Sequence, residues 1–347
     1  MGLGKKKMLS QGASAAPTPV GTDNFNTVLY TGNGSTQSIT GVGFQPDFVW
    51  VKERSATGQH SLFDSVRGAT KRLASNSTSA ESTATSSLTS FDSDGFSFGA
   101  ESGNNNGVTA VSWNWYAPTA ESISASGSRV ASTIKKNVDA GFSIVKTTSP
   151  SSTIDFNYGH GLSQAPELVM VKTLNIASYW EVIFPDTFGS ASGSSSPSDW
   201  NRIKLNEPDA VMSSNAYLAA DGTKIYNGAW QANTELINYC FHSVAGYQKV
   251  SKYTGTSGSV TVSDVGFQPR WIMIKRTEGA GDWEIVDSVR GDGGFNTAKF
   301  LEAGNAGAEF TQSGYGVTFT STGFTIPSGA REGLNVNGEV FIYLAIA

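Results

Sequence analysis

Short apolar runs separated by polar, turn-forming residues follow one another along the chain. The run Phe-Val-Trp-Val at 48–51 is nearly continuous, which is typical of a strand buried on both faces. Pro46 lies just before it, and because proline fixes φ and lacks an N–H, we place it before the strand rather than inside it. Turn residues such as Asp94 and Gly95 precede a further strand. The pattern predicts an all-β protein with antiparallel strands.

The same motifs return at a fixed interval. Tyr-Thr-Gly, Gly-Phe-Gln-Pro and Asp-Ser-Val-Arg-Gly begin at Tyr30, Gly43 and Asp64, and again 223 residues later at Tyr253, Gly266 and Asp287 (253 − 30, 266 − 43, 287 − 64). Such gap-free spacing indicates an internal repeat.

A divergent middle copy lies between these two. Pro166 and Trp180 precede Pro269 and Trp283 by the same 103 residues (269 − 166, 283 − 180), and the first copy has His60 at the aromatic position. The middle copy lacks Asp-Ser-Val-Arg-Gly and carries a Ser-rich insert near 190–198.

We therefore predict three tandem antiparallel β-sandwich domains in series. A copy of roughly 100 residues with regular turn signals has the length and rhythm of a sandwich. A lysine follows each proline-led strand, and we expect it to mark the solvent-exposed end. The predicted boundaries are an extended N-terminal arm at 1–21, domains at 22–120, 138–246 and 247–347, and a linker or bracing strands at 121–137.

Composition supports this fold class and narrows the partners. Among the 347 residues, 15% are charged, against roughly 25% in ordinary soluble domains, and 39 are Gly, which argues against a helical bundle. The net charge of −5 provides no general field for nucleic acid. No apolar stretch approaches the roughly 20 residues that a membrane helix needs. The single cysteine, Cys240, cannot form an intramolecular disulfide and is expected in the core.

Two acid–base pairs recur in the first and third copies. Asp64 with Arg67, and Asp287 with Arg290, have the spacing of an ion pair across a turn, with Gly68 or Gly291 supplying the positive φ. A turn is duplicated more readily than an active site, so we interpret both pairs as structural.

Other candidate chemistry is weaker. Asp92, Asp94 and Glu101 supply oxygen ligands of the kind that Ca²⁺ takes, but their spacing matches no calcium loop and turn chemistry explains them. The three histidines have no metal-ligand spacing to one another, and no nucleophile has a recognisable catalytic arrangement. We predict no metal, no cofactor and no enzyme activity.

Some tryptophans are candidates for stacking on sugar rings. Trp50, Trp113, Trp115 and Trp271 lie in apolar strand patterns and are expected in the core. The candidates for carbohydrate contact are Trp180, Trp200, Trp230 and Trp283, which have more polar neighbours. The alternative is that these rings pack between domains or against another protein.

The quoted repeat motifs resemble a domain repeated in virion proteins of tailed phages, especially marine ones. The resemblance covers most of residues 22–347 and extends to Tyr239-Cys240-Phe241. It implies lectin-like, jelly-roll-type β-sandwich domains in a structural protein of the phage particle, often labelled tail fibre, and no transferable catalytic residue. It also implies other virion proteins as partners, a place in the virion and a homo-oligomer within it.

The leading hypothesis is a tail fibre or host-attachment component whose N-terminal arm docks on another virion protein through Lys5, Lys6 and Lys7. Head (capsid) decoration is an alternative within the same class. A carbohydrate-binding module that recognises a host surface glycan is a second hypothesis. A glycan-degrading depolymerase is a third, and it would need a carboxylate pair from Asp282, Glu284 and Asp287.

Overall fold

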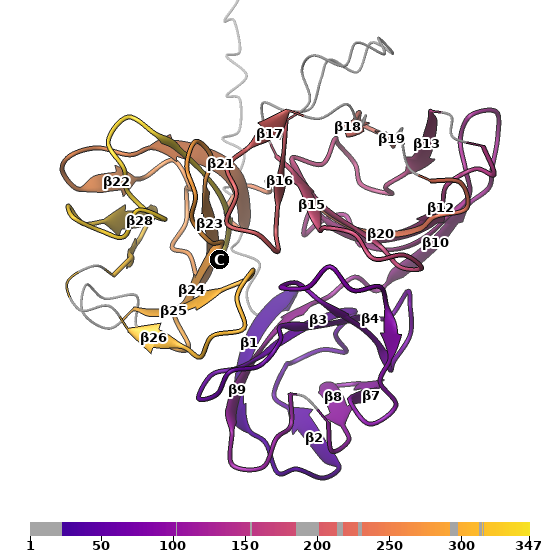
Figure 1. The fold of residues 1–347 in the computed structure, drawn as a ribbon, viewed down its shortest axis with the longest axis horizontal. Helices are drawn as coiled ribbons and strands as arrows, with labels where there is room; N and C mark the ends of the chain where they lie inside the picture. Colours follow the sequence, from indigo (N-terminus) through magenta and orange to yellow (C-terminus); the bar gives the residue numbers. More distant parts are fainter. Residues whose placement is uncertain are drawn as a thin grey trace, which may run out of the picture.

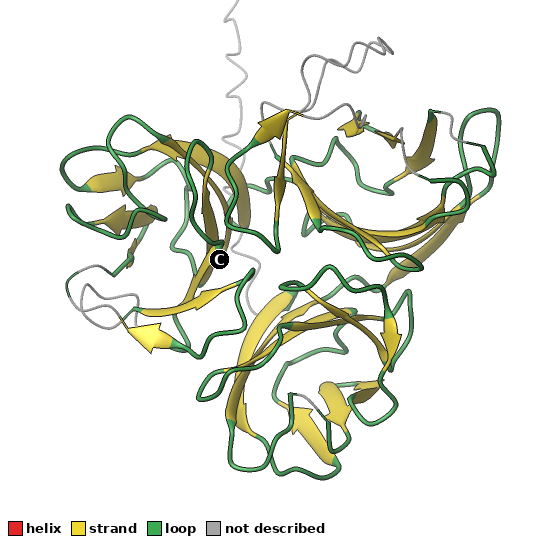
Figure 2. Ribbon diagram, in the orientation of Figure 1, coloured by secondary structure: helices red, strands yellow, loops and turns green. Residues whose placement is uncertain are grey.

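A computed structural model describes residues 23–101, 103–152, 155–184, 201–213, 218–227, 231–291, 298–311, 314 and 316–347. Figure 2 shows that these residues form strands and loops. Each strand pairs antiparallel with its neighbours, so the predicted all-β, antiparallel class is confirmed. Among the described residues, no helix has the length and apolarity needed to cross a membrane.

Six sheets form three units, each with one larger and one three-stranded sheet (Figure 1). Unit 1 contains β1 (Phe25–Thr31), β2 (Gln37–Thr40), β3 (Phe48–Glu53), β4 (Ser61–Asp64), β5 (Lys71–Ala74), β6 (Ser82–Thr83), β7 (Leu88–Asp92), β8 (Gly95–Phe98) and β9 (Thr109–Trp115). Unit 2 contains β10 (Thr119–Ile123), β11 (Ser132–Asn137), β12 (Phe142–Thr148), β13 (Phe156–Gly159), β14 (Leu168–Thr173), β15 (Glu181–Ile183), β16 (Asn201–Lys204), β17 (Met212–Ser213), β18 (Leu218–Ala220), β19 (Lys224–Asn227) and β20 (Glu235–Phe241). Unit 3 contains β21 (Gln248–Thr254), β22 (Val260–Val262), β23 (Trp271–Arg276), β24 (Glu284–Asp287), β25 (Lys299–Glu302), β26 (Phe310–Thr311), β27 (Thr318–Thr320), β28 (Gly323–Ile326) and β29 (Val340–Ile346).

The strand order of the larger sheet is the same in all three units. It runs β1-β9-β3-β4-β5-β6 in unit 1, β12-β20-β14-β15-β16-β17 in unit 2 and β21-β29-β23-β24-β25-β26 in unit 3. In unit 2 the outer side of β12 carries two more strands, β11 and then β10. These strands occupy most of the segment that the sequence left open as a linker or bracing strands.

The third strand in the common order of each larger sheet, β3, β14 or β23, is buried on both faces, as the continuous apolar runs predict. Val49 and Val51 on β3 pack in the interior of unit 1 with Phe96 and Phe98 of the smaller sheet. The alternate residues Phe48 and Trp50 belong instead to a cluster that contains residues of all three units. Period-two alternation therefore sends one face of the sheet to its own unit and the other to a shared core.

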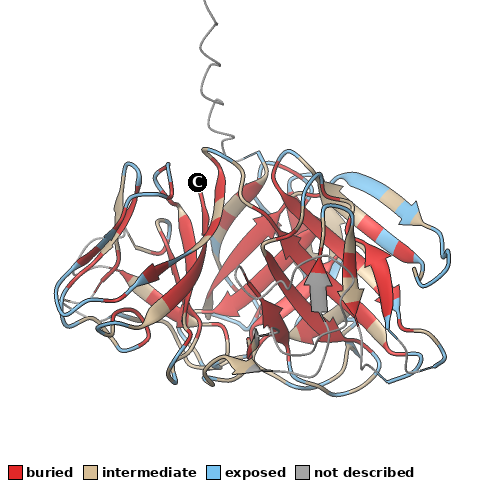
Figure 3. Cartoon of the chain, turned by 90° about the horizontal axis from the view of Figure 1, so that it is seen from above, coloured by how far each residue is buried: buried red, intermediate tan, exposed pale blue. Residues whose placement is uncertain are grey.

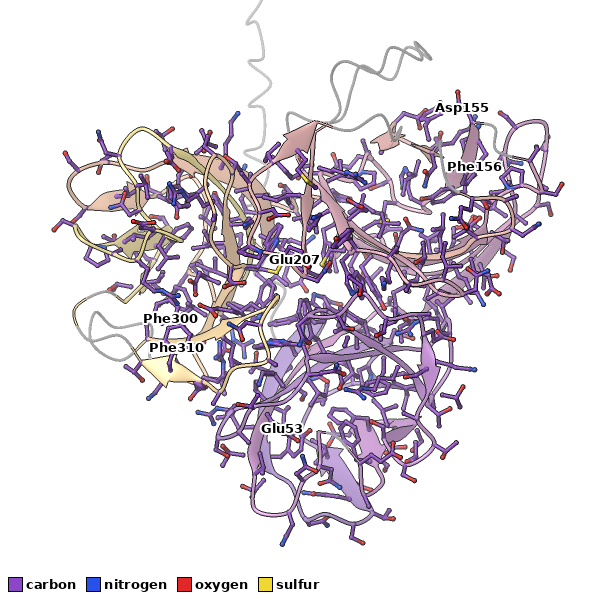
Figure 4. The ribbon with its side chains drawn as sticks, viewed as in Figure 1. Glu53, Asp155, Phe156, Glu207, Phe300 and Phe310 are labelled. Carbon is purple, nitrogen blue, oxygen red and sulfur yellow. The ribbon has the colours of Figure 1, made fainter. Side chains whose placement is uncertain are left out.

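The three units surround this shared core, and the predicted arrangement in series is replaced by a ring (Figure 1). Figure 3 shows the buried residues mainly on strands in the interior and the exposed residues mainly at the periphery. Side chains fill the space between the sheets, and Glu207 lies where units 2 and 3 meet (Figure 4). Towards the outside of unit 3, Phe300 on β25 stacks on Phe310 on β26 with ring centroids 5.6 Å apart. The fold therefore creates three contact zones between neighbouring units.

Candidate functional site at the seams between the units

We call the contact zones seam 1–2, seam 2–3 and seam 3–1 after the units that meet there. Two backbone hydrogen bonds recur in every seam at corresponding positions. They are Ser178 N to Thr78 O and Glu81 N to Leu174 O (both 2.9 Å) in seam 1–2, Gly281 N to Pro208 O (2.9 Å) and Val211 N to Thr277 O (2.8 Å) in seam 2–3, and Gly58 N to Ala306 O (2.9 Å) and Glu309 N to Arg54 O (2.8 Å) in seam 3–1. Because each of the three seams contains the same pair of bonds, the ring is closed with pseudo-threefold symmetry.

The residue just before β4, β15 or β24 has an aromatic ring, and this ring lies in a seam. The indole N–H of Trp180 donates to Ala74 O, and that of Trp283 donates to Lys204 O, each across 2.8 Å. Ala74 and Lys204 lie at the same register, opposite Ser61 and Glu181. The two tryptophans therefore join unit 2 to unit 1 and unit 3 to unit 2 in the same way.

His60 takes the tryptophan position in seam 3–1. Its ring lies beside the backbone of Glu302 in unit 3, and its Nδ1 accepts a hydrogen bond from Trp50 Nε1 across 2.9 Å. Burial, with further help from the charge of Lys52, lowers the pKa of His60 well below its usual value. The imidazole is therefore neutral at pH 7.

A change of partner accompanies the histidine. Trp50 is replaced in the corresponding position of the other units by Met170 and Met273, which pair with Tyr239 and Leu344 as Trp50 pairs with Trp113. Unit 1 thus has a tryptophan, Trp50, together with His60. Units 2 and 3 have a methionine at the first of these positions and a tryptophan at the second. The exchange keeps the volume of the shared core nearly constant.

The lysines that follow the proline-led strands are buried, so the prediction that they mark an exposed end is wrong. Lys172 Nζ donates to Thr78 O of unit 1 (2.9 Å), and Lys275 Nζ donates to Pro208 O of unit 2 (2.9 Å). Lys52 Nζ donates within its own unit to Glu53 O (2.7 Å). Burial lowers the pKa of all three ammonium groups to about 8. Backbone carbonyls replace the water that each charge has lost.

The Asp64–Arg67 pair forms the predicted turn and also belongs to seam 1–2. Asp64 Oδ1 accepts from Arg67 N (2.8 Å), Arg67 Nε pairs with Asp64 Oδ2, and Gly68 has a φ of +96°. Across the seam, Tyr239 Oη of unit 2 donates to Asp64 Oδ2 over 2.8 Å. Both charged side chains are buried, and the phenol supplies a donor that the buried carboxylate needs.

The Asp287–Arg290 pair repeats this arrangement in seam 3–1 with a different donor. Arg290 N donates to Asp287 Oδ1 (2.8 Å), and Trp113 Nε1 of unit 1 donates to Asp287 Oδ2 (3.0 Å). The guanidinium carbon of Arg290 lies 5.3 Å from the centroid of the Trp113 ring. An indole thus replaces the phenol of seam 1–2.

Seam 2–3 has apolar residues at both places. Phe184 follows directly on the Val169–Ile183 pair, at the register where units 1 and 3 have their aspartates, and Leu344 stands where they meet Tyr239 and Trp113. Phe184 and Leu344 are buried in the shared cluster. Where the neighbouring unit offers no donor, the carboxylate is absent as well, which avoids an unpaired buried charge.

Two of the predicted carbohydrate contacts are buried. Trp180 and Trp283 have no exposed surface, because each ring is enclosed in a seam. A sugar cannot reach either ring, so for these two residues the prediction is wrong and the alternative of packing between domains holds. Trp200, Trp230, Lys5, Lys6, Lys7 and the Ser-rich insert lie outside the described residues. Trp50, Trp113, Trp115, Trp271 and Cys240 are buried as predicted.

Of the three carboxylates considered for glycan cleavage, Asp287 and Glu284 are buried, whereas Asp282 is partly exposed. Asp287 is bound by Arg290 and Trp113, and Glu284 pairs with Arg331 at 3.0 Å. Burial, with smaller contributions from Glu302 and Asp282, raises the pKa of Glu284 to about 8. The carboxyl group of Glu284 is therefore largely protonated at pH 7, although the charge of Arg331 lowers its pKa.

Of the acidic residues considered as calcium ligands, Asp94 and Asp92 use their carboxylates in local hydrogen bonds. Asp94 accepts from Gly43 N (2.7 Å) and Gly41 N (3.1 Å), and Asp92 accepts from the hydroxyls of Ser90 (2.8 Å) and Ser97 (2.7 Å). Within the described part of the chain, no three His, Cys, Asp or Glu side chains are grouped so as to hold a metal ion.

Sequence reasoning missed that the turn pairs, the ring aromatics and the lysines all serve the seams. A signal was present in the comparison of the copies. Two copies have an aspartate where the middle copy has a phenylalanine. The facing position on the last strand of the neighbouring unit changes with it, from Tyr or Trp opposite aspartate to Leu opposite phenylalanine.

One family model matches residues 20–347, so a single description spans all three units. The chain belongs to the family described as domain of unknown function DUF7483. No curated protein matches the sequence. In this DUF7483 chain the recurring polar chemistry lies in the three seams, where it joins one unit to the next.

Proposed function

We propose that this DUF7483 protein is a non-enzymatic structural component of a phage virion, built from three lectin-like β-sandwich repeats. One observation carries the proposal: the same backbone bonds close all three seams, and the buried charged groups of the repeats are used to hold the units together. The resemblance of the repeat motifs to phage virion proteins supplies the biological setting. A rigid ring with a polar surface that has few charged residues suits a particle that must persist outside the cell.

Within the virion, the proposed role is a tail fibre or host-attachment component anchored by the N-terminal arm. Lys5, Lys6 and Lys7 would give that arm a positive end for an acidic groove on another virion protein. The test is particle assembly with Lys5, Lys6 and Lys7 changed to Glu. We expect the variant to fold and to be depleted from purified particles, and full occupancy would contradict the anchoring role.

The pseudo-threefold ring favours a second candidate, decoration of the head. A chain with three similar units around one axis presents three similar surfaces to a partner with threefold symmetry. Imaging of purified particles separates the two roles. Copies at the tail tip support host attachment, and copies on the threefold axes of the shell support decoration.

Binding of a host glycan would add to either role. The candidate rings that remain are Trp200 and Trp230. If the isolated protein binds host surface polysaccharide, Trp200→Ala or Trp230→Ala is expected to weaken that binding. Release of reducing ends from the polysaccharide would contradict the non-enzymatic proposal.

A further inference from the structure

The first strand of each smaller sheet, β2, β13 or β22, lies at the end of its sheet, and the three units treat its outer edge differently. In unit 2 the segment that leads into β11 pairs with this edge. Val130 N donates to Asn157 O of β13 over 2.8 Å, and Asn157 N donates to Ser128 O over 3.1 Å. Arg129 thus lies beside Asn157 in a parallel bridge, and the chain continues into β11, which pairs with β12. Main chain therefore covers the edge of β13.

In unit 1 side-chain amides link β2 to the larger sheet. Gln37 Nε2 donates to Thr31 O of β1 over 3.1 Å. Asn26 Nδ2 donates to a carbonyl in the loop after β2, also over 3.1 Å. Val260 and Lys249 occupy the corresponding places in unit 3, 223 residues later (260 − 37, 249 − 26). Unit 3 therefore has neither of these amides.

In unit 3 an open pocket lies between the end of β21 and β22, on the outer side of the unit (Figure 1). Its volume is about 480 Å³, which is within the range of roughly 300–1,000 Å³ found for ligand pockets. Five serine or threonine residues line it, and Asp264 is the one charged residue in the lining. The pocket is therefore polar and carries a single negative charge.

Thr261, in the middle of β22, turns its backbone N–H and C=O towards the outer edge. A two-residue turn joins β27 to β28, so Thr320 and Gly323 form the hydrogen-bonded pair beside it. Alternation along β28 then directs the backbone groups of Thr325 to β27, which leaves the Thr261–Thr325 pair without backbone bonds. The two threonine hydroxyls lie 3.2 Å apart, as the closer side chains of such a pair allow. Within the described part of the chain, no hydrogen bond reaches the N–H or C=O of Thr261.

Thr261 occupies the place that Asn157 has in unit 2. Each is followed by a residue buried in the interior of its own unit, Val262 after Thr261 and Tyr158 after Asn157. In unit 2 the outward N–H and C=O of Asn157 are both bonded by main chain. An edge strand with such groups unpaired is a template for another strand. Unit 2 therefore shows which kind of group fits the edge of β22.

We propose that this pocket of unit 3 binds an extended peptide segment of a partner protein, which lies parallel to β22 and bonds to both backbone groups of Thr261. Backbone hydrogen bonds supply affinity in this mode of recognition, and neighbouring side chains supply specificity. The segment resembles Ser128-Arg129-Val130 of unit 2, with a small polar residue, a basic residue and a β-branched residue in turn. The basic residue complements the charge of Asp264. This binding does not depend on a place in the virion.

An NMR titration of the full chain tests the proposal. The probe is the capped peptide Ser-Gly-Ser-Arg-Val-Ala-Ser, which has the sequence of residues 126–132. We expect the amide signal of Thr261 to shift and to saturate at roughly millimolar peptide, because a few hydrogen bonds each contribute modestly. A peptide methylated on the valine nitrogen cannot donate to Thr261 O and is expected to bind about fivefold more weakly. The amide of Ser38, the corresponding residue of unit 1, is the internal control. No saturable shift at Thr261, or an equal shift at Ser38, would overturn the proposal.

A charge change separates binding in the pocket from attraction elsewhere on the surface. Asp264 is exposed, so Asp264→Asn is expected to leave the fold intact and to weaken binding of the arginine peptide about threefold. Binding of the same peptide with glutamine in place of arginine should not change. An equal effect on both peptides would contradict the role of Asp264. Host surface polysaccharide is the second ligand to titrate, and a shift of Thr261 with the polysaccharide but not with the peptide would overturn the proposal in favour of a glycan site.

Discussion

Tyr239 donates its phenolic hydroxyl to Asp64 across 2.8 Å, and this bond joins unit 2 to a buried carboxylate of unit 1. The two residues are 175 positions apart in the sequence, and each has a counterpart in the other units. The contact shows how a residue that reads as part of a turn serves the closure of the ring.

Removing this donor is expected to weaken seam 1–2. Tyr239→Phe leaves the Asp64 carboxylate with one buried acceptor site unfilled, and we expect a loss of about 1–3 kcal/mol in the free energy of unfolding. Urea denaturation measures it. The matched control is Tyr226→Phe, whose hydroxyl bonds Asp221 at 2.7 Å in a more exposed place, so that water can replace the phenol. Equal losses in the two variants would contradict a special role for the seam.

Much of the strand pattern could be predicted from the sequence, because it depends on local chemistry. The continuous run at 48–51 indicates a strand buried on both faces, and this holds in the structure. What covers the second face could not be read from one copy, since Phe48 stacks on Tyr239 of unit 2 and Trp50 belongs to the same cluster of residues from all three units. The seam residues Trp180 and Lys172 were misplaced for the same reason, because their partners are carbonyls of another unit.

A single unit is expected not to be stable by itself. In the isolated fragment 22–120, the rings of Phe48, Trp50, Trp113 and Trp115 lose the shared core that buries them. An exposed apolar face of this size drives association. Size-exclusion chromatography of the fragment should show aggregates or oligomers, and the full chain should unfold in one transition. A monomeric, cooperatively folded fragment would contradict the shared core.

The buried lysines predict a rise in stability at alkaline pH. Burial lowers the pKa of Lys52, Lys172 and Lys275 to about 8, from an ordinary value of 10.5. Above pH 8 the folded chain therefore binds fewer protons than the unfolded chain, and stability rises with pH until the lysines of the unfolded chain also lose their protons. Urea midpoints at pH 8.5 and 9.5 measure the slope, which should be smaller in Lys172→Met. A slope that is flat or falling in the wild-type protein would exclude this effect.

At acidic pH, His60 is expected to destabilise the ring. Burial holds its pKa in the folded chain well below the ordinary 6.5, so the neutral ring contributes its full stability above that pH. As pH falls below about 6.5 the unfolded chain takes up a proton that the folded chain refuses, and stability falls. The pKa of His160 is also lowered, mainly by burial. Glu284, whose pKa is raised to about 8, gives the opposite slope over this range, so the contribution of His60 is measured as a difference. In a His160→Gln background, a further His60→Gln substitution should make the change in stability from pH 7 to pH 5 less unfavourable, and an identical change in the two variants would contradict this role of His60.

The aromatic exchange between units predicts that two substitutions will compensate each other. Unit 1 has Trp50 with His60, whereas unit 2 has Met170 with Trp180. Trp50→Met alone leaves a cavity in the shared core and removes the donor to His60 Nδ1, and His60→Trp alone crowds Trp50, so each is expected to cost about 1–3 kcal/mol.

Together the two substitutions recreate the pairing of unit 2, and the new indole N–H can donate to the backbone carbonyl of Glu302 in unit 3. The double variant should recover at least about half of the summed loss, because residues in contact are coupled rather than additive. It should also lose the part of the acid sensitivity that belongs to His60. Strictly additive losses in a double-mutant cycle would mean that the two positions are not exchanged as a pair, and the pseudo-threefold correspondence of the seams would not extend to these side chains.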